Sequence, residues 1–286
     1  MKTNEEQLAM LSLTGRIHHP THSTSFRTGY DGKGRILPST GGITYNFKIG
    51  DNCMDIVGDH IEPGVSLKNP DGRENEALLL LSCIGNVAKV TSGDAKGKKG
   101  VVTGKHGGID HLFVYFDEAT LDELNVNDTI LIKGFGQGLE LLDYPHIKVM
   151  NLDPALLLKL NFVEKDHKLH VGVTHIVPAY LMGSGIGASE MLSGDYDIMT
   201  QDKNAVHEFG LESLRFGDII AIQDHNSHNG AHYEKDSVTI GVIVHSDSYS
   251  SGHGPGVTVI MSAYNHEIVP FIDKDANLIH YIDTKS

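Results

Sequence analysis

The chain consists largely of short apolar runs that end at turn residues, and this spacing constrains its fold more than any other feature. Between residues 76 and 150 the runs are rich in Val, Ile, Leu or Phe, and most are bounded by Gly or Asn-Asp turns. Runs of this length and composition predict strands. The expected strands of this part are 77–83, 87–91, 100–103, 111–116, 129–133 and 147–150.

The rest of the chain also consists of short apolar runs bounded by turn residues, except for two segments that are expected to be helical. Glycine makes up 32 of the 286 residues, well above the average of about 7%, which favours tight turns over long helices. Asp153 and Pro154 predict the start of a short helix that ends near residue 160, because Asp is a good N-cap and Pro suits the first helical position. A second helix is expected over 203–214. Further strands are expected at 169–177, 219–223, 238–245, 257–261 and 278–282.

These signals predict a mainly β protein with a small β-barrel, a second β-rich layer and few short helices. Residues 1–75 are turn-rich and are expected to pack with the C-terminal part. Residues 76–150 are expected to form the barrel. Residues 151–286 are expected to form a β-rich domain that carries His-rich loops.

One turn recurs three times, the last two times before a predicted strand, and indicates architecture rather than chemistry. Gly50-Asp51, Asn127-Asp128 and Gly217-Asp218 each close a four-residue turn. Gly or Asn tolerates positive φ, and Asp hydrogen-bonds back to the backbone. We therefore expect each turn to be structural.

Charge and cysteine content limit the expected partners and the expected cellular location of the protein. With 23 basic and 37 acidic residues the net charge is −14, which disfavours nucleic acid as a partner of the whole surface. Cys53 and Cys83 form no C-x-x-C pair, so neither a disulfide framework nor a thiolate zinc site is expected. No leader or membrane-spanning apolar segment is visible. We therefore expect a cytoplasmic protein with no membrane partner.

Histidine is the compositional outlier, with 18 residues, and it concentrates in loops after strands. The segment 223–232 holds Asp224, His225 and His228, and a second loop near 250–258 holds His253. Imidazole and carboxylate are ligands of divalent metals. We therefore predict that these four residues bind a divalent metal, zinc or manganese. The alternative is a hydrated turn without a role.

Three further residues are candidates for proton transfer. His60 and Glu62 alternate in the segment 58–65 and would share one face of an extended chain. His245 ends the strand predicted before the second His-rich loop. We therefore predict catalytic roles for His60, Glu62 and His245. The alternative for the first two is a capped turn with Pro63-Gly64 as its corner.

The segment 85–102 is basic within an acidic chain and has a Gly-rich turn between two predicted strands. This segment resembles a KOW-type element, which implies a β-barrel module of the kind common in ribosomal and transcription proteins. Lys96, Lys98 and Lys99 are the residues that would contact phosphates of a nucleotide or RNA. The alternative is a solvated hairpin whose lysines protect an exposed edge.

Two resemblances concern larger parts of the chain. With Gly41–Asn46, Gly58–Gly64 and Gly252–Thr258, the chain resembles an uncharacterised prokaryotic family of domains of unknown function of about this length, which implies a β-dominated fold and no established reaction. The C-terminal segments 217–225 and 240–244 are similar to strand-loop-strand pieces of the acetamidase/formamidase family. That similarity implies hydrolysis of small amides in a β-rich fold.

Together these features lead to one main hypothesis and two rivals. The main hypothesis is a metal-assisted hydrolase of a small polar substrate, with an amide as the candidate class. The first rival is a non-enzymatic barrel that binds nucleotide or RNA phosphates through its lysines. The second is a homo-oligomer whose exposed strand edges pair between subunits.

Overall fold

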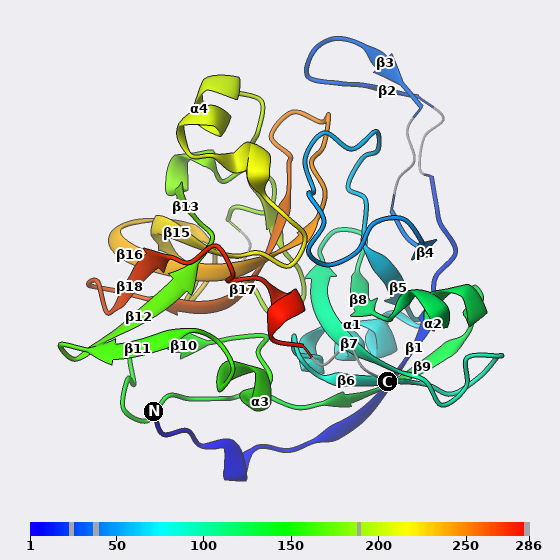
Figure 1. The fold of residues 1–286 in the computed structure, drawn as a ribbon, viewed down its shortest axis with the longest axis horizontal. Coiled ribbons are helices and arrows are strands. Elements are labelled where there is room, and N and C mark those ends of the chain that lie inside the picture. The colour runs from blue at the N-terminus through cyan, green and yellow to red at the C-terminus, as the bar shows by residue number, and fades with distance from the viewer. Residues whose placement is uncertain (23–25, 37–39, 188–189, 283–286) are drawn as a thin grey trace.

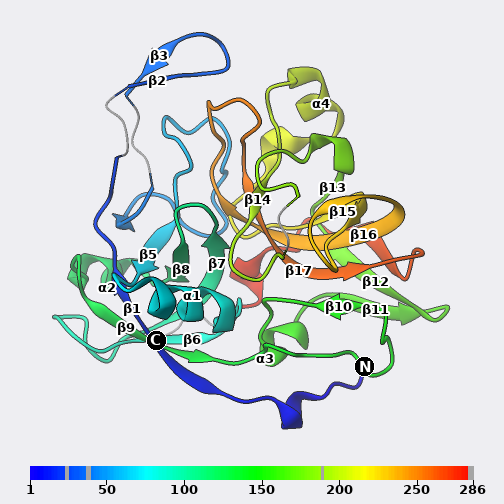
Figure 2. The same ribbon diagram turned by 180° about the vertical axis from the view of Figure 1, so that it is seen from behind.

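Two β-rich regions lie side by side in the computed structural model, which describes residues 1–22, 26–36, 40–187 and 190–282. Figure 1 and the reverse view in Figure 2 show one region built mostly from early strands and the other from late strands. The first region is a closed antiparallel barrel and the second is a set of curved sheets. The prediction of a mainly β fold with a barrel, a second β layer and few short helices is confirmed.

The barrel has six strands in the order β1-β9-β6-β7-β8-β5, and β5 pairs back onto β1 through Ile17 and Leu67. Side chains that alternate inward along these strands, such as Ile130 and Ile132, form its core. The strands are β1 (Leu11–Ile17), β5 (Gly64–Lys68), β6 (Val87–Val90), β7 (Lys99–His106), β8 (His111–Tyr115) and β9 (Thr129–Gly134), and β4 (Ile43–Thr44) extends the edge of β5.

The barrel takes two strands from the segment that was expected to pack with the C-terminal part. Both β1 and β5 lie within residues 1–75, whereas β10 (Lys148–Val149) pairs with the second layer instead. Barrel closure joins strands that are distant in sequence, and local turn signals carry no information about such pairings. The strand pattern alone therefore placed the start of the barrel too late.

The second layer is a six-stranded sheet with the path β10-β17-β16-β15-β13, and β14 pairs with β17. Every residue of β17 is buried, which agrees with its mostly apolar sequence. A three-stranded sheet with the order β11-β12-β18 lies beside it, and β2 and β3 form a projecting hairpin (Figure 1). The strands are β13 (His175–Pro178), β14 (Tyr196–Asp197), β15 (Ile219–Asn226), β16 (His232–His245), β17 (Gly256–Ala263), β11 (Phe162–Lys165), β12 (Lys168–Val173), β18 (Ile268–Ile272), β2 (Arg27–Thr28) and β3 (Gly34–Arg35).

Helices are short, and one replaces a predicted strand. Residues 77–83 were expected to be extended, but α1 covers Gly72–Leu81. Asp71 caps this helix by accepting from the N–H groups of Arg73 and Glu74, and the Leu run that follows has high helix propensity. The others are α2 (Glu118–Glu123), α3 (Pro154–Leu157) and α4 (Lys203–Glu208), with 3-10 turns η1 (Glu5–Gln7), η2 (Ala179–Leu181), η3 (Leu211–Ser213) and η4 (Leu278–His280).

Both predicted helices exist but end early, and a second strand prediction is wrong. Helix α4 gives way at Gly210, which has φ of +66°, to the turn η3. The segment 278–282 starts with the turn η4 rather than a strand, because the Asn277 side chain caps Ile279 N–H. In the described part of the chain, no helix is both long and apolar enough to cross a membrane.

The barrel and the second layer are in direct contact through β7. An added Cβ on Gly104 would lie 2.3 Å from Cγ1 of Val244, so only glycine lets β7 approach β16 this closely. The next residue fixes the contact, because Thr258 Oγ1 donates to the Lys105 carbonyl at 3.0 Å and accepts from its N–H at 3.2 Å. This contact brings the end of β7 to the end of β16.

Candidate metal centre

Six side chains able to bind a metal gather where the barrel meets the second layer. Two come from the barrel side, in the loop before β5 and at the end of β7. Four come from the second layer, at β14, at the end of β16 and in the loop before β17. They form two groups, which we name the outer triad (His60, Asp197 and His253) and the inner triad (His106, Asp195 and His245).

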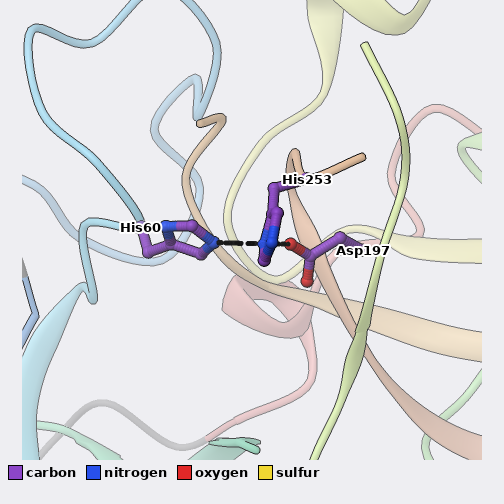
Figure 3. A group of neighbouring side chains, drawn as sticks. All are labelled: His60, Asp197 and His253. Atoms are coloured by element: carbon purple, nitrogen blue, oxygen red, sulfur yellow. Dashed lines mark hydrogen bonds and ion pairs between the residues drawn. The ribbon is translucent and has the colours of Figure 1, made fainter. Parts of the chain in front are cut away.

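The outer triad brings three potential ligand atoms together. His253 Nδ1 lies 2.9 Å from Asp197 Oδ2 and 3.1 Å from His60 Nε2, and His60 Nε2 lies 3.4 Å from Asp197 Oδ2. Figure 3 shows the His60 and Asp197 side chains pointing toward the His253 ring from opposite sides. Bonds of about 2.1 Å to one metal ion at ordinary angles separate ligand atoms by about 3.0–3.4 Å, so the spacing suits a shared cation.

The inner triad lies deeper. Its His245 side chain is 0% exposed and its Asp195 side chain 4% exposed. His245 Nε2 is 2.9 Å from Asp195 Oδ2, yet neither atom has a hydrogen-bond partner of acceptable geometry. His245 Nδ1 donates to the Ser246 carbonyl at 2.9 Å, so a neutral ring turns the Nε2 lone pair toward the carboxylate. Two buried acceptors facing each other indicate a site for a cation.

Gly256 leaves the space that the inner triad needs. A Cβ on this residue would lie 2.1 Å from Asp195 Oδ2 and 2.3 Å from His245 Nε2. Any other residue would therefore displace both atoms. The absence of a side chain at this position keeps the two potential ligands free to turn toward a common point.

A network behind His60 fixes its ring. Asp59 Oδ1 lies 3.2 Å from His60 Nδ1 and accepts from Ser248 Oγ at 2.6 Å. Arg27 Nη1 approaches the other oxygen of Asp59 at 3.5 Å. A carboxylate on the far nitrogen of an imidazole is the usual support of a metal-binding histidine. His60 also has φ of +55°, a backbone conformation that is unfavourable for His and that aims the ring inward.

Glu62 supports the inner triad in the same way. Its side chain is 1% exposed, and it accepts from His106 Nδ1 at 2.6 Å and from His111 Nδ1 at 2.9 Å. It also accepts from the Gly41 N–H at 3.0 Å and from the Ser66 hydroxyl. All its lone pairs are engaged, so Glu62 orients His106 and leaves the other nitrogen of that ring, Nε2, for the site.

The electrostatics of the centre favour positive charge. Burial would raise the pKa of Asp197, but the three neighbouring imidazoles hold it well below its usual range. Burial would lower the pKa of His245, but the Asp195 and Asp197 carboxylates raise it well above its ordinary value. Burial would also lower the pKa of His60, but the Asp197 and Asp59 carboxylates raise it above its ordinary value. Carboxylates buried among imidazoles need either protons or a metal cation on the rings.

A cavity of about 480 Å³ opens next to the centre. Both carboxylates and three of the four imidazoles line it, and His245 lies behind them. The remaining lining residues are mostly small or polar, including Ser184, Gly185, Glu190 and Ser193. A volume of this size admits a small polar molecule to the outer triad.

The donor set fits a divalent metal of intermediate character. It offers imidazole nitrogens and carboxylate oxygens and no thiolate, because both Cys53 and Cys83 are buried elsewhere as free thiols. Zinc, manganese and non-haem iron all accept such ligands. The residues present therefore fit the kind of metal that the sequence predicted.

Three of the sequence-predicted site residues lie in the centre. His60 and His253 belong to the outer triad and His245 to the inner triad. Glu62 lies behind His106 rather than in the cavity, so proton transfer with substrate is not available to it.

The other three predicted ligands do not join His253. Asp224 lies in a β-bulge and accepts from the Asp236 N–H at 2.8 Å. The His225 ring stacks on Tyr196 with 5.2 Å between ring centroids, and His228 packs on Tyr264 at 4.2 Å. Side chains alternate along β14, so Tyr196 and His225 lie on the opposite face from Asp197. In an antiparallel hairpin, moreover, the turn after β15 and the loop after β16 leave from opposite ends.

Of the lysines proposed for phosphate binding, Lys96 and Lys98 lie in the turn between β6 and β7, and Lys99 begins β7. Lys96 and Lys99 are exposed and Lys98 is half-buried. Lys99 is paired across the hairpin with Lys89. This turn is part of the barrel wall, and none of the three lysines belongs to either triad.

Sequence reasoning missed His106, Asp195 and Asp197. The alternation Asp195-Tyr196-Asp197 puts two carboxylates on one face of an extended segment, which is a signal that the sequence carried. His106 ends a strand just before Gly107-Gly108, where functional side chains are common. Neither signal predicts which other residues complete each triad, because the triads form only where the barrel contacts the second layer.

Comparison with known proteins agrees with the fold and identifies the family. A family model described as domain of unknown function (DUF4438), N-terminal, matches residues 26–158, and its C-terminal counterpart matches residues 159–282. The crystal structure of TM1086 has 48% sequence identity to this chain and a TM-score of 0.95, and the match covers 99% of each chain. No curated protein matches the chain. These comparisons do not support the weaker resemblances to acetamidase/formamidase or to KOW elements. The chain therefore belongs to the DUF4438 family of domains of unknown function, which confirms the resemblance found from its sequence.

Proposed function

We propose that this protein is a divalent-metal-dependent hydrolase of a small polar substrate, with short amides as the first candidates. The observation that carries the proposal is the outer triad, whose three ligand atoms lie 2.9–3.4 Å apart at the wall of a cavity of about 480 Å³. Three protein ligands with an open side are the usual pattern of a catalytic metal site. A divalent cation there would polarise a carbonyl group and lower the pKa of a water molecule.

The chain's own residues would hold and orient the reactants. Asp59 fixes the ring of His60, and the three ligand atoms already lie 2.9–3.4 Å apart, so they need little rearrangement. Ser184 and Gly185 also line the cavity, and these small residues leave room for a small substrate. In amide hydrolysis the water oxygen bonds to the carbonyl carbon, the C–N bond breaks, and one water proton ends on the leaving nitrogen.

We assign the proton transfer to Glu190. It lines the cavity but belongs to neither triad. Its oxygens accept from the Leu192 N–H at 2.6 Å and from Ser193 Oγ at 2.8 Å, which hold the carboxylate in place. A positioned carboxylate of this kind typically contributes about 10²–10⁴-fold to rate.

The test combines metal content with activity. Protein reconstituted with Mn²⁺ or Zn²⁺ is expected to retain at least one metal per chain and to release ammonia from formamide, acetamide or propionamide. His253→Ala should reduce metal binding and abolish ammonia release. His266→Ala is the matched control, because His266 is a partly exposed imidazole paired with Asp236 outside the centre.

Two further results decide the assignment. Glu190→Gln should keep the metal and lower kcat, whereas loss of the metal in this variant would contradict its assigned role. Reconstituted wild-type protein that holds less than about a tenth of an equivalent of any divalent metal would overturn the proposed function. Metal binding without hydrolysis of any amide would remove the amide class and leave a metal-binding protein.

A further inference from the structure

The outer triad alone would make a site for one metal ion. The inner triad is not part of that site, yet it also has the features of a metal site. His245 Nε2 and Asp195 Oδ2 are buried, 2.9 Å apart and without hydrogen-bond partners. Unsatisfied polar atoms at this depth are rare, because burial removes the water that would otherwise bind them. The free space beside Gly256 allows both atoms to face a common point.

Asp197 links the two triads. Its Oδ2 atom faces His253 Nδ1 at 2.9 Å and His60 Nε2 at 3.4 Å. Its Oδ1 atom faces the other way and lies 3.5 Å from His245 Nε2. A carboxylate with one oxygen toward each of two ligand groups is the arrangement by which Asp bridges a pair of metals.

The ring positions agree with a compact pair of sites. The centroids of His60 and His245 lie 4.9 Å apart, and those of His106 and His245 lie 4.4 Å apart. The metal ions of two-metal hydrolytic sites typically lie about 3.5–4 Å apart. Ligand groups in contact through one carboxylate suit that separation.

The charges of the centre are compatible with two divalent cations. Four carboxylates surround the imidazoles: Asp195 and Asp197 among the ligands, and Asp59 and Glu62 behind them. With neutral imidazoles these sum to −4, which two divalent ions balance and one does not. Arg27, the cation that approaches Asp59, has a side chain that is 51% exposed and lies at 3.5 Å.

We infer that the centre binds two divalent cations, with Asp197 bridging them, the outer triad completing one site and the inner triad the other. This inference rests on the proposed function and deepens it. The outer cation faces the cavity and keeps an open side for substrate and water. The inner cation takes its ligands from four side chains, because Asp197 Oδ1 joins the inner triad, and it lies on the side of the centre where His245 is fully buried.

The experiment uses the full chain and Mn²⁺ as the probe. Metal per chain is measured after reconstitution and desalting, and electron paramagnetic resonance reports whether two ions are spin-coupled through a bridge. Wild-type protein is expected to hold two Mn²⁺ with a coupled spectrum. Asp195→Asn should hold one Mn²⁺ with an uncoupled six-line spectrum, because Asn keeps the hydrogen bond from the Gly107 N–H but loses the charged ligand.

Matched variants separate the two sites. Asp273→Asn is the control for Asp195→Asn, since Asp273 also accepts a backbone N–H on Oδ1 but lies outside the centre. His253→Ala should lose the outer ion and retain the inner one. Gly256→Ala is a second probe of the inner site and should lose the inner ion through the added Cβ.

The outcomes distinguish this inference from the proposed function. One Mn²⁺ per wild-type chain, unchanged in Asp195→Asn, would overturn the two-metal centre and leave the mononuclear hydrolase standing. Two ions without spin coupling would overturn the bridging role of Asp197. Wild-type protein that binds no Mn²⁺ or Zn²⁺ would overturn both proposals.

Discussion

At the scale of single residues, the backbone of His60 shows how the site is assembled. His60 has φ of +55°, and its N–H reaches the Asp247 carbonyl at 3.4 Å. The next residue, Ile61, donates to Ser246 Oγ at 2.8 Å and accepts from the Ser246 N–H at 2.9 Å. These bonds join the loop before β5 to the end of β16. An unfavourable φ is therefore retained because neighbouring bonds fix it, as is common at functional sites.

The first residue-scale prediction concerns Asp59. Asp59→Asn removes the charge that orients His60 and should weaken Mn²⁺ binding by about 10–100-fold, as loss of such supporting groups usually does. Titration calorimetry of metal-free protein measures the effect. Asp31→Asn is the control, because Asp31 pairs with Arg35 on the β2–β3 hairpin outside the centre. Equal affinity in both variants would contradict the supporting role of Asp59.

The second residue-scale prediction concerns His225, whose burial lowers its pKa to about 4 from 6.5. Between about pH 4 and pH 6.5 the His225 side chain is protonated in the unfolded chain but neutral in the folded chain. Stability therefore falls as the pH drops through this window. From pH 7.5 to pH 5 the loss attributable to His225 is about 2 kcal/mol, at about 1.4 kcal/mol per pKa unit.

His225→Phe tests this prediction, because it keeps a ring to stack on Tyr196 and removes the titration. Urea denaturation at the two pH values should show a smaller loss for the variant than for the wild type. His207→Phe serves as the control, since His207 is 88% exposed. An identical loss in wild type and His225→Phe would show that this ring does not control the acid response.

Residue types alone gave part of the site. Histidines in loops beside strands pointed to His60, His245 and His253, and all three are in the two triads. The same criterion selected His225, which packs into the interior instead. A histidine and its chain position do not reveal which face of a strand it occupies once bulges shift the register, as happens between Gln223 and His225.

At the scale of secondary-structure elements, one turn is used three times. Asp51, Asp128 and Asp218 each accept, through Oδ2, the N–H of the residue three positions earlier. Each also donates its own N–H back to the carbonyl of that residue. The Gly-Asp and Asn-Asp pattern predicts this geometry. The sequence therefore predicted these turns correctly, because their structure depends only on neighbouring residues. The sequence did not distinguish helix from strand at α1, because a run of Leu residues is equally apolar in a capped helix and in a buried strand.

The element-scale prediction compares two of these turns. Asp218 is 0% exposed and also accepts from Asn277 Nδ2 at 2.8 Å and pairs with Arg215 at 2.9 Å. Asp218→Ala leaves buried donors without a partner and should lower the free energy of unfolding by about 3–5 kcal/mol. Asp51→Ala removes the same turn bond near the surface and should cost about 1 kcal/mol. Urea unfolding measures both, and similar losses would contradict the role of the buried network.

At the scale of the whole molecule, the centre depends on contact between the two regions. Each triad takes one histidine from residues 26–158 and one aspartate and one histidine from residues 159–282. The strand pattern predicted both β layers, but the triads require β7 to meet β16 beside Gly104. That contact is long-range and depends on barrel closure, which no local signal encodes.

A metal bound between the two regions should therefore stabilise their association. If metal binds only the folded chain, a free concentration one hundred times Kd adds about 2.7 kcal/mol. For a chain of this size that corresponds to a rise in Tm of roughly 4–5 °C. Differential scanning calorimetry with Mn²⁺ and with a chelator measures the shift. Because Asp197 faces both triads, Asp197→Asn should lose most of the shift, whereas His266→Ala should retain it. A Tm that does not change between chelator and Mn²⁺ would mean that the six side chains hold their positions through protons on the imidazoles alone.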